Sequence, residues 1–183
     1  MKPLSLSINV LQHNINVNPK LTADYFCRIG KSGYISAQKG REGDSKTPIG
    51  KYRLRFGLYR PDRVPPPQSE LTFWPLSPND GWCDADGDAA YNRFIRLPYP
   101  ASHEALWRED GAYDIILVMS HNDSPPRRDE HGVGLGSAVF IHIAQPDDRR
   151  TLGCVAVTPD VMASLLPHLY VGMEVDIHAG KPS

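Results

Sequence analysis

Residues 137–157 read SAVFIHIAQPDDRRTLGCVAV, and this stretch decides how the rest of the chain is interpreted. Its first arm, residues 138–144, is apolar and rich in β-branched side chains, which predicts a buried strand. The arm at residues 155–157 has the same character. A polar turn separates the arms, so a histidine leaving one strand and a cysteine entering the next can meet across a loop.

His142 and Cys154 are the residues that this loop would bring together. Cysteine attacks carbonyls as its thiolate, and a nearby imidazole helps to form that species. Gly153 would let a substrate approach the backbone and would let N–H groups face an oxyanion. On these grounds we expect Cys154 to react with iodoacetamide faster than an ordinary thiol at pH 7. Taken alone, the spacing more often marks two buried core residues, because free cysteine is usually buried and inert.

Two sequence blocks resemble motifs of the L,D-transpeptidase catalytic domain, the YkuD family. One is Phe-Ile-His followed by Thr-Leu-Gly-Cys-Val, and the other is GDSKTPIGKY at residues 43–52. Three shorter blocks, at residues 80–84, 91–93 and 106–108, are similar to a small bacterial branch of the family. The resemblance covers residues 24–178 and implies a mainly β, sandwich-like fold with a few short helices.

The resemblance also implies roles for individual residues. Cys154 would be the nucleophile, His142 its base, and Gly153 part of the catalytic motif. The candidate substrate-binding residues are Thr151, Ser137, Asn92 and Arg93. The common family pattern has histidine, glycine and arginine where this chain has Leu152, Ile143 and Ala156.

The implied reaction is acyl transfer on a peptidoglycan stem peptide or muropeptide through a thioester at Cys154. An amine acceptor gives L,D-transpeptidation, which is the family default. Water as acceptor gives an L,D-carboxypeptidase that trims muropeptides during recycling. A third alternative is an inactive domain that binds peptidoglycan peptides. None of the three needs a metal or another cofactor.

Composition narrows the class of protein. The 183 residues suffice for one domain, which we expect to span residues 1–183, and the net charge of −1 argues against nucleic acid as a partner. The 17 prolines and 15 glycines favour a loop-rich β fold, and no apolar run is long enough for a transmembrane segment. Residues 1–10 alternate like a strand and not like a signal peptide. We therefore expect a cytoplasmic protein if Met1 is the natural start, and a periplasmic one if an export segment was removed.

Periodicity predicts the remaining elements. Residues 24–30 and 34–37 read as a strand pair around a turn at Lys31–Gly33, and residues 50–59 as a half-buried strand with a basic outer face. Ser102 suits the N-cap of a short helix at residues 103–108, and Thr158-Pro159-Asp160 the start of a later one. Further strands are expected at residues 1–10, 15–17, 94–97, 113–120 and 173–177.

Other chemistry-bearing residues have ordinary interpretations. His121 also leaves a predicted strand and is the rival to His142, but no nucleophile motif follows it. Asp84–Asp88 superficially suggests calcium, although the run lacks the glycine and glutamate of an EF-hand loop. We expect Cys27 to lie in the core.

Overall fold

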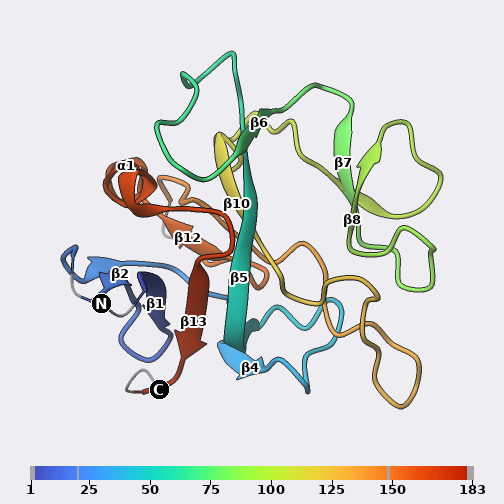
Figure 1. The fold of residues 1–183 in the computed structure, drawn as a ribbon. Coiled ribbons are helices and arrows are strands. Elements are labelled where there is room, and N and C mark those ends of the chain that lie inside the picture. Colours follow the sequence, from blue (N-terminus) through green and yellow to red (C-terminus); the bar gives the residue numbers. More distant parts are fainter. Residues whose placement is uncertain (1–2, 20, 148, 181–183) are drawn as a thin grey trace.

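The architecture is built around one long strand. The computed structural model describes residues 3–19, 21–147 and 149–180, and in it β5 (Thr47–Tyr59) crosses the whole molecule (Figure 1). Tyr52 and Leu54 are buried, while Lys51, Arg53 and Arg55 face solvent. The alternation predicted from residues 50–59 is therefore confirmed, basic outer face included.

The other strands extend the sheet on both sides of β5. In the described chain the order is β12-β11-β10-β5-β13-β1-β2-β3, and β4 and β6 also pair with β5. The bounds are β1 (Ser5–Asn9), β2 (Asn14–Asn18), β3 (Tyr25–Phe26), β4 (Tyr34–Ser36), β6 (Phe73–Pro75), β10 (Ile115–Met119), β11 (Phe140–Ile143), β12 (Val155–Val157) and β13 (Glu174–His178). The predicted turn at Gly33 forms, but the strands on either side of it do not pair with each other. β3 instead pairs with β2, and β4 runs parallel to β5.

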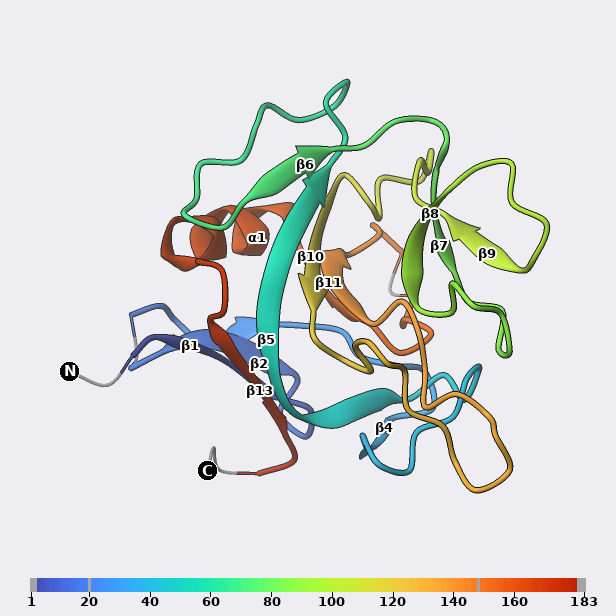
Figure 2. The ribbon, with the colours of Figure 1, turned by 45° about the vertical axis from the view of Figure 1, so that its right-hand side comes forward.

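A small second sheet lies on the opposite side of β5 from β1 and β2 (Figure 2). It has the order β8 (Arg93–Arg96), β7 (Asp80–Cys83) and β9 (His103–Ala105). The helix predicted at residues 103–108 is wrong, because this segment pairs antiparallel with β7. A helix of six residues is marginal by itself, whereas pairing satisfies the buried backbone of β7.

The helix predicted after Thr158 is confirmed. It is α1 (Pro159–Leu165), with proline in its first turn and Met162 and Leu165 buried. Thr158 is the N-cap by position but makes no side-chain cap hydrogen bond. A 3₁₀ turn, η1 (Leu166–His168), follows α1. No helix in the described residues is long and apolar enough to cross a bilayer.

Two apolar clusters meet at β11. Ile141 and Ile143 belong to the larger cluster, which also contains the fully buried Cys27. Phe140 belongs to the second, where its ring packs on Trp82 with centroids 5.0 Å apart. Because side chains alternate along a strand, His142 lies on the same face of β11 as Phe140. The second cluster therefore supports the segment that carries the candidate base.

Candidate active site

The loop before β12 has a conformation that requires glycine. Gly153 has φ +140°, and a Cβ atom there would lie 3.1 Å from the carbonyl oxygen of Lys46. Glycine adopts positive φ and close approach without steric cost. The backbone of residues 151–153 is thus packed tightly against the segment before β5.

Two threonine hydroxyls hold this loop. The fully buried Thr47 donates to the carbonyl of Gly153 at 2.9 Å and accepts from the Gly30 N–H at 2.9 Å. Thr151 Oγ1 donates to the carbonyl of Cys154 at 2.6 Å and accepts from the Gly153 N–H at 3.2 Å. Thr151 therefore shapes the loop around the candidate nucleophile in addition to lining the cavity described below.

The Cys154 thiol is partly buried and hydrogen-bonded. Its Sγ donates to the carbonyl of Ala138 at 3.1 Å and accepts from the N–H of Phe140 at 3.3 Å. Burial, and to a lesser degree the charge of Glu104, raise the pKa of Cys154 to about 12, because both disfavour the thiolate. The neutral thiol is therefore favoured at rest, and the expected fast reaction of Cys154 with iodoacetamide at pH 7 stays a prediction.

His142 is fixed as a neutral base. Its Nδ1 lies 2.8 Å from the carbonyl of Ile143, and a carbonyl can only accept, so Nδ1 carries the proton and Nε2 keeps the lone pair. Burial lowers the pKa of His142 below its usual value. The ring packs edge-on against Tyr113, with centroids 5.4 Å apart.

The candidate nucleophile and the candidate base open into one cavity of about 710 Å³. Cys154, His142, Gly153, Thr151 and Ser137 all line it. Within the described chain no hydrogen bond joins Cys154 Sγ to His142. Proton transfer therefore requires the S–H group to turn from the Ala138 carbonyl toward the imidazole.

The cavity carries both signs of charge. Its acidic lining residues are Glu42, Asp84 and Glu104, and its basic ones include Lys31, Arg108, Arg149 and Arg150. Burial raises the pKa values of Glu42 and Glu104 above their usual range. Asp84 Oδ1 is buried without a hydrogen-bond partner among the described residues. Such a surface suits a ligand that bears both ammonium and carboxylate groups.

Comparison with known proteins places this chain in a family. The family model of the L,D-transpeptidase catalytic domain, YkuD, matches residues 7–177. This chain belongs to the YkuD family. No match was found among curated proteins.

Two solved structures resemble this YkuD domain. The structure of Bdellovibrio bacteriovorus Bd1075 aligns with a TM-score of 0.50 and 17% identity over 96% of this chain and 47% of that chain. Mycobacterium tuberculosis L,D-transpeptidase 1 aligns with a TM-score of 0.44 and 13% identity over 97% of this chain and 59% of that chain. The chain thus spans about half the length of these proteins, and the likeness to Bd1075 concerns the fold.

The structure does not bring every predicted site residue of the YkuD domain into the cavity. Asn92 and Arg93 are not among its lining residues. The oxygen and the nitrogen of the Asn92 side-chain amide are both hydrogen-bonded inside the protein. Arg93 lies on β8 opposite Cys83. Their predicted role in substrate binding would therefore require them to act from outside the cavity.

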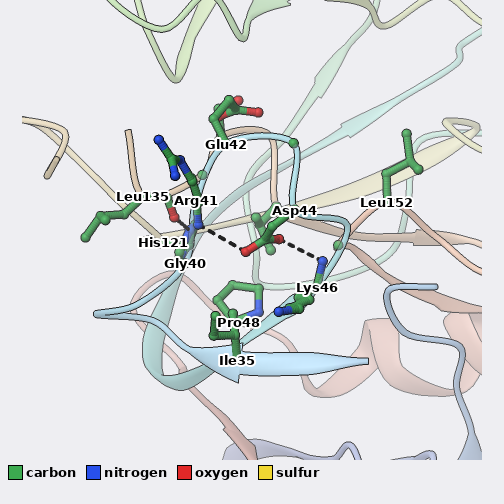
Figure 3. A pocket seen from close by; sticks show the side chains of 15 residues that line it. Ile35, Gly40, Arg41, Glu42, Asp44, Lys46, Pro48, His121, Leu135 and Leu152 are labelled. Atoms are coloured by element: carbon green, nitrogen blue, oxygen red, sulfur yellow. Dashed lines mark hydrogen bonds between the residues drawn. The ribbon is translucent and has the colours of Figure 1, made fainter. Parts of the chain in front are cut away.

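The rival histidine lies in a different, smaller cavity of about 40 Å³ (Figure 3). His121 lines this cavity with Asp44, which accepts the backbone N–H groups of Arg41 and Lys46. His121 Nε2 lies 3.3 Å from the carbonyl of Leu135, and burial lowers its pKa to about 4. Cys154 is not among the residues that line this cavity.

Sequence reasoning missed three residues that line the cavity together with the candidate nucleophile. Tyr113 and Glu104 face the cavity, and the Tyr113 hydroxyl donates to Glu104 Oε1 at 2.7 Å. Arg108 also lines it, and its guanidinium lies over the Tyr113 ring at 5.0 Å. The only signal in the sequence was the family-like block at residues 106–108, which ends at Arg108.

Proposed function

We propose that this YkuD domain is a cysteine acyltransferase that acts on peptidoglycan stem peptides. Cys154 would attack the amide carbonyl on the carboxyl side of a meso-diaminopimelate residue. The observation that carries the proposal is that Cys154 and His142 open into one cavity in a chain that the YkuD family model matches. The family match supports the fold, and the reaction at Cys154 is the part that we propose.

In the first half-reaction, His142 Nε2 accepts the Cys154 proton as the sulfur bonds to the carbonyl carbon. The imidazolium then protonates the leaving amine, the C–N bond breaks, and a thioester remains. The raised pKa of the Cys154 thiol and the lowered pKa of His142 keep the proton on sulfur at rest. The transfer is therefore coupled to attack on bound substrate.

Backbone N–H groups would stabilise the negative charge that develops during the reaction. The Gly153 N–H already binds Thr151 Oγ1, so the Cys154 N–H is the donor that we assign to the oxyanion. The Phe140 N–H, which contacts Sγ, stabilises the thiolate as it forms and leaves. This division gives separate donors to the two centres on which negative charge develops.

The charges of the cavity support a diaminopimelate-containing donor. The side chain of that residue ends in an ammonium and a carboxylate. Among the lining residues, Glu42, Asp84 and Glu104 can take the ammonium, and Lys31, Arg149 and Arg150 can take carboxylates. A peptide that ends its third residue in an uncharged group would leave the buried Asp84 Oδ1 without a partner.

In the second half-reaction an amine or water attacks the thioester, His142 Nε2 accepts its proton, and the C–S bond breaks so that the proton returns to Cys154 Sγ. Hydrolysis needs no further catalytic residue, and one feature favours it. Ala156, where the family commonly has arginine, is buried on β12 beside His142 and offers no charged contact to an acceptor peptide. We keep transpeptidation as the first assignment and L,D-carboxypeptidation as the second.

The test incubates purified protein with disaccharide-tetrapeptide, with and without excess D-methionine, and measures products by mass spectrometry. Exchange of D-alanine for D-methionine supports transpeptidation. Tripeptide alone, even with excess amine, supports carboxypeptidation. Unchanged substrate, with binding still measurable by calorimetry, would overturn the enzyme assignment in favour of a peptide-binding domain.

A further inference from the structure

Ala138 holds an unusual backbone conformation beside the nucleophile. Its φ is +49°, in the left-handed region that residues with a Cβ rarely adopt. In this conformation the carbonyl of Ala138 accepts the Cys154 S–H at 3.1 Å, and two residues later the Phe140 N–H contacts the same sulfur at 3.3 Å. Strained backbone of this kind persists only where its surroundings hold it in place.

The side chain of Asn92 is hydrogen-bonded to the backbone of Ala138. Its Oδ1 accepts the Ala138 N–H at 3.1 Å and the indole N–H of Trp82 at 2.9 Å. Its Nδ2 donates to the carbonyls of His121 at 3.1 Å and Asn122 at 2.8 Å. All four hydrogen-bonding positions of this amide are thus directed into the protein.

The backbone of Asn92 suits this position. Its φ is +57°, a conformation that asparagine tolerates better than most residues. Its N–H donates to the carbonyl of Cys83 at 2.9 Å, which ties it to β7 and, through Trp82, to the ring of Phe140. Asn92 therefore connects the small sheet to the segment that contacts the sulfur.

We propose that Asn92 is a positioning residue for the nucleophile, which holds Ala138 in the left-handed conformation so that the Ala138 carbonyl keeps the Cys154 proton and orients Sγ. The inference rests on the proposed role of Cys154, but it does not depend on the substrate or the acceptor. Under this proposal Asn92 positions the sulfur of Cys154 and does not bind the substrate peptide.

The proposal predicts the direction of a change in thiol acidity. A carbonyl can bind only the neutral thiol, so losing the Ala138 contact favours the thiolate and lowers the pKa of Cys154. The other charged or titratable groups around the sulfur are Glu104, Arg108, Tyr113 and His142. None of them hydrogen-bonds to Asn92, so a substitution there leaves them in place.

The test measures iodoacetamide alkylation of the full chain between pH 7 and pH 10, with each cysteine followed by peptide mapping. Asn92→Gly removes the amide while accepting the positive φ. Asn122→Gly is the matched control, because Asn122 is also an asparagine with positive φ, at +49°, but its side chain bonds the backbone of Gly136 and Arg127. The substitution keeps the backbone carbonyl of Asn122, which accepts from Asn92. The buried Cys27 and Cys83 report in the same sample whether the fold is intact.

We expect Asn92→Gly to raise the alkylation rate of Cys154 at least tenfold at pH 8, with Asn122→Gly matching the wild type. Adding Ala138→Gly to Asn92→Gly should restore much of the wild-type rate, because glycine takes the left-handed conformation without support. In the acyl-transfer assay Asn92→Gly should lower kcat and leave KM nearly unchanged. Alkylation needs no peptide, so a failure of the proposed reaction would leave this test standing.

An unchanged Cys154 rate in Asn92→Gly, or an equal increase in Asn122→Gly, would overturn the proposal. If Asn92→Gly exposes Cys27 or Cys83, Asn92→Asp replaces it, since it keeps an oxygen for the Ala138 N–H. That variant should alkylate within about twofold of the wild type, and a tenfold increase with Cys27 and Cys83 still protected would contradict the inference.

Discussion

His121 follows β10 and His142 lies on the neighbouring strand β11, yet the two histidines have different surroundings. Both are buried, and burial lowers the pKa of each. His142 opens into the cavity that contains Cys154, and its Nδ1 is oriented by the Ile143 carbonyl. His121 donates to Leu135, and its Nδ1 is buried without a partner in the described structure. A histidine at a strand end becomes a candidate base only when a free nitrogen faces a nucleophile.

The largest expected effect concerns Cys154, which lines the cavity of His142 and not that of His121. Cys154→Ala should lower kcat by on the order of 10⁴-fold or more, because no other group can form the thioester. Cys27→Ala and Cys83→Ala should keep most of the activity, since both thiols are buried outside the cavity. Steady-state kinetics on the tetrapeptide donor measures all three variants, and full activity in Cys154→Ala would refute the chemistry.

The next effect separates the two histidines directly. His142→Ala should lower kcat by roughly 10²–10⁴-fold, the usual contribution of a positioned general base. His121→Ala should change kcat far less. The active form of His142 is neutral, so the rate should fall with decreasing pH only as the pH passes below the usual histidine pKa. A larger loss in His121→Ala would mean that the base is misassigned.

A smaller effect concerns the loop that carries the nucleophile. Thr47→Val keeps the shape of the side chain but leaves the Gly153 carbonyl and the Gly30 N–H without a buried partner. We expect a loss of about 1–3 kcal/mol in unfolding free energy and about a tenfold lower kcat. Thr47→Ser retains the hydroxyl and serves as the control. Equal behaviour of the two variants in thermal melts and kinetics would show that the hydroxyl does not hold the loop.

The smallest effect on activity, but a distinct one on stability, comes from His121. Its folded-state pKa is about 4, so between about pH 6.5 and pH 4 the unfolded chain binds a proton that the folded chain refuses. Stability should therefore fall as pH decreases through that window, by up to about 3 kcal/mol at 1.36 kcal/mol per unit. Urea melts of wild type and His121→Gln at several pH values measure this, and parallel pH dependences would contradict it.

Local patterns predicted the elements whose burial follows from their own sequence. The alternation of Tyr52 and Leu54 predicts β5, and the apolar run of residues 155–157 predicts β12. The local pattern of residues 103–108 predicts a helix, because the pairing of His103–Ala105 with β7 is a long-range contact that no local pattern reveals.

The candidate site likewise combines residues that a local pattern predicts with residues that only long-range contacts bring together. Cys154 and His142 could be proposed from one contiguous stretch. Tyr113 and Glu104 reach the cavity from segments whose sequence carries no comparable signal. Asn92 was grouped with substrate contacts because a family-like block contains it. Only the structure shows that its amide is directed to Ala138 and to three other internal partners.

The central claim is that Cys154 carries the acyl group, and intact-protein mass spectrometry after rapid acid quench tests it most directly. With tetrapeptide donor, the wild type should gain the mass of the peptide minus D-alanine, and peptide mapping should place the adduct on Cys154. Cys154→Ala should show no adduct and no product. An adduct on Cys27 or Cys83, or product release by Cys154→Ala at the wild-type rate, would contradict the account.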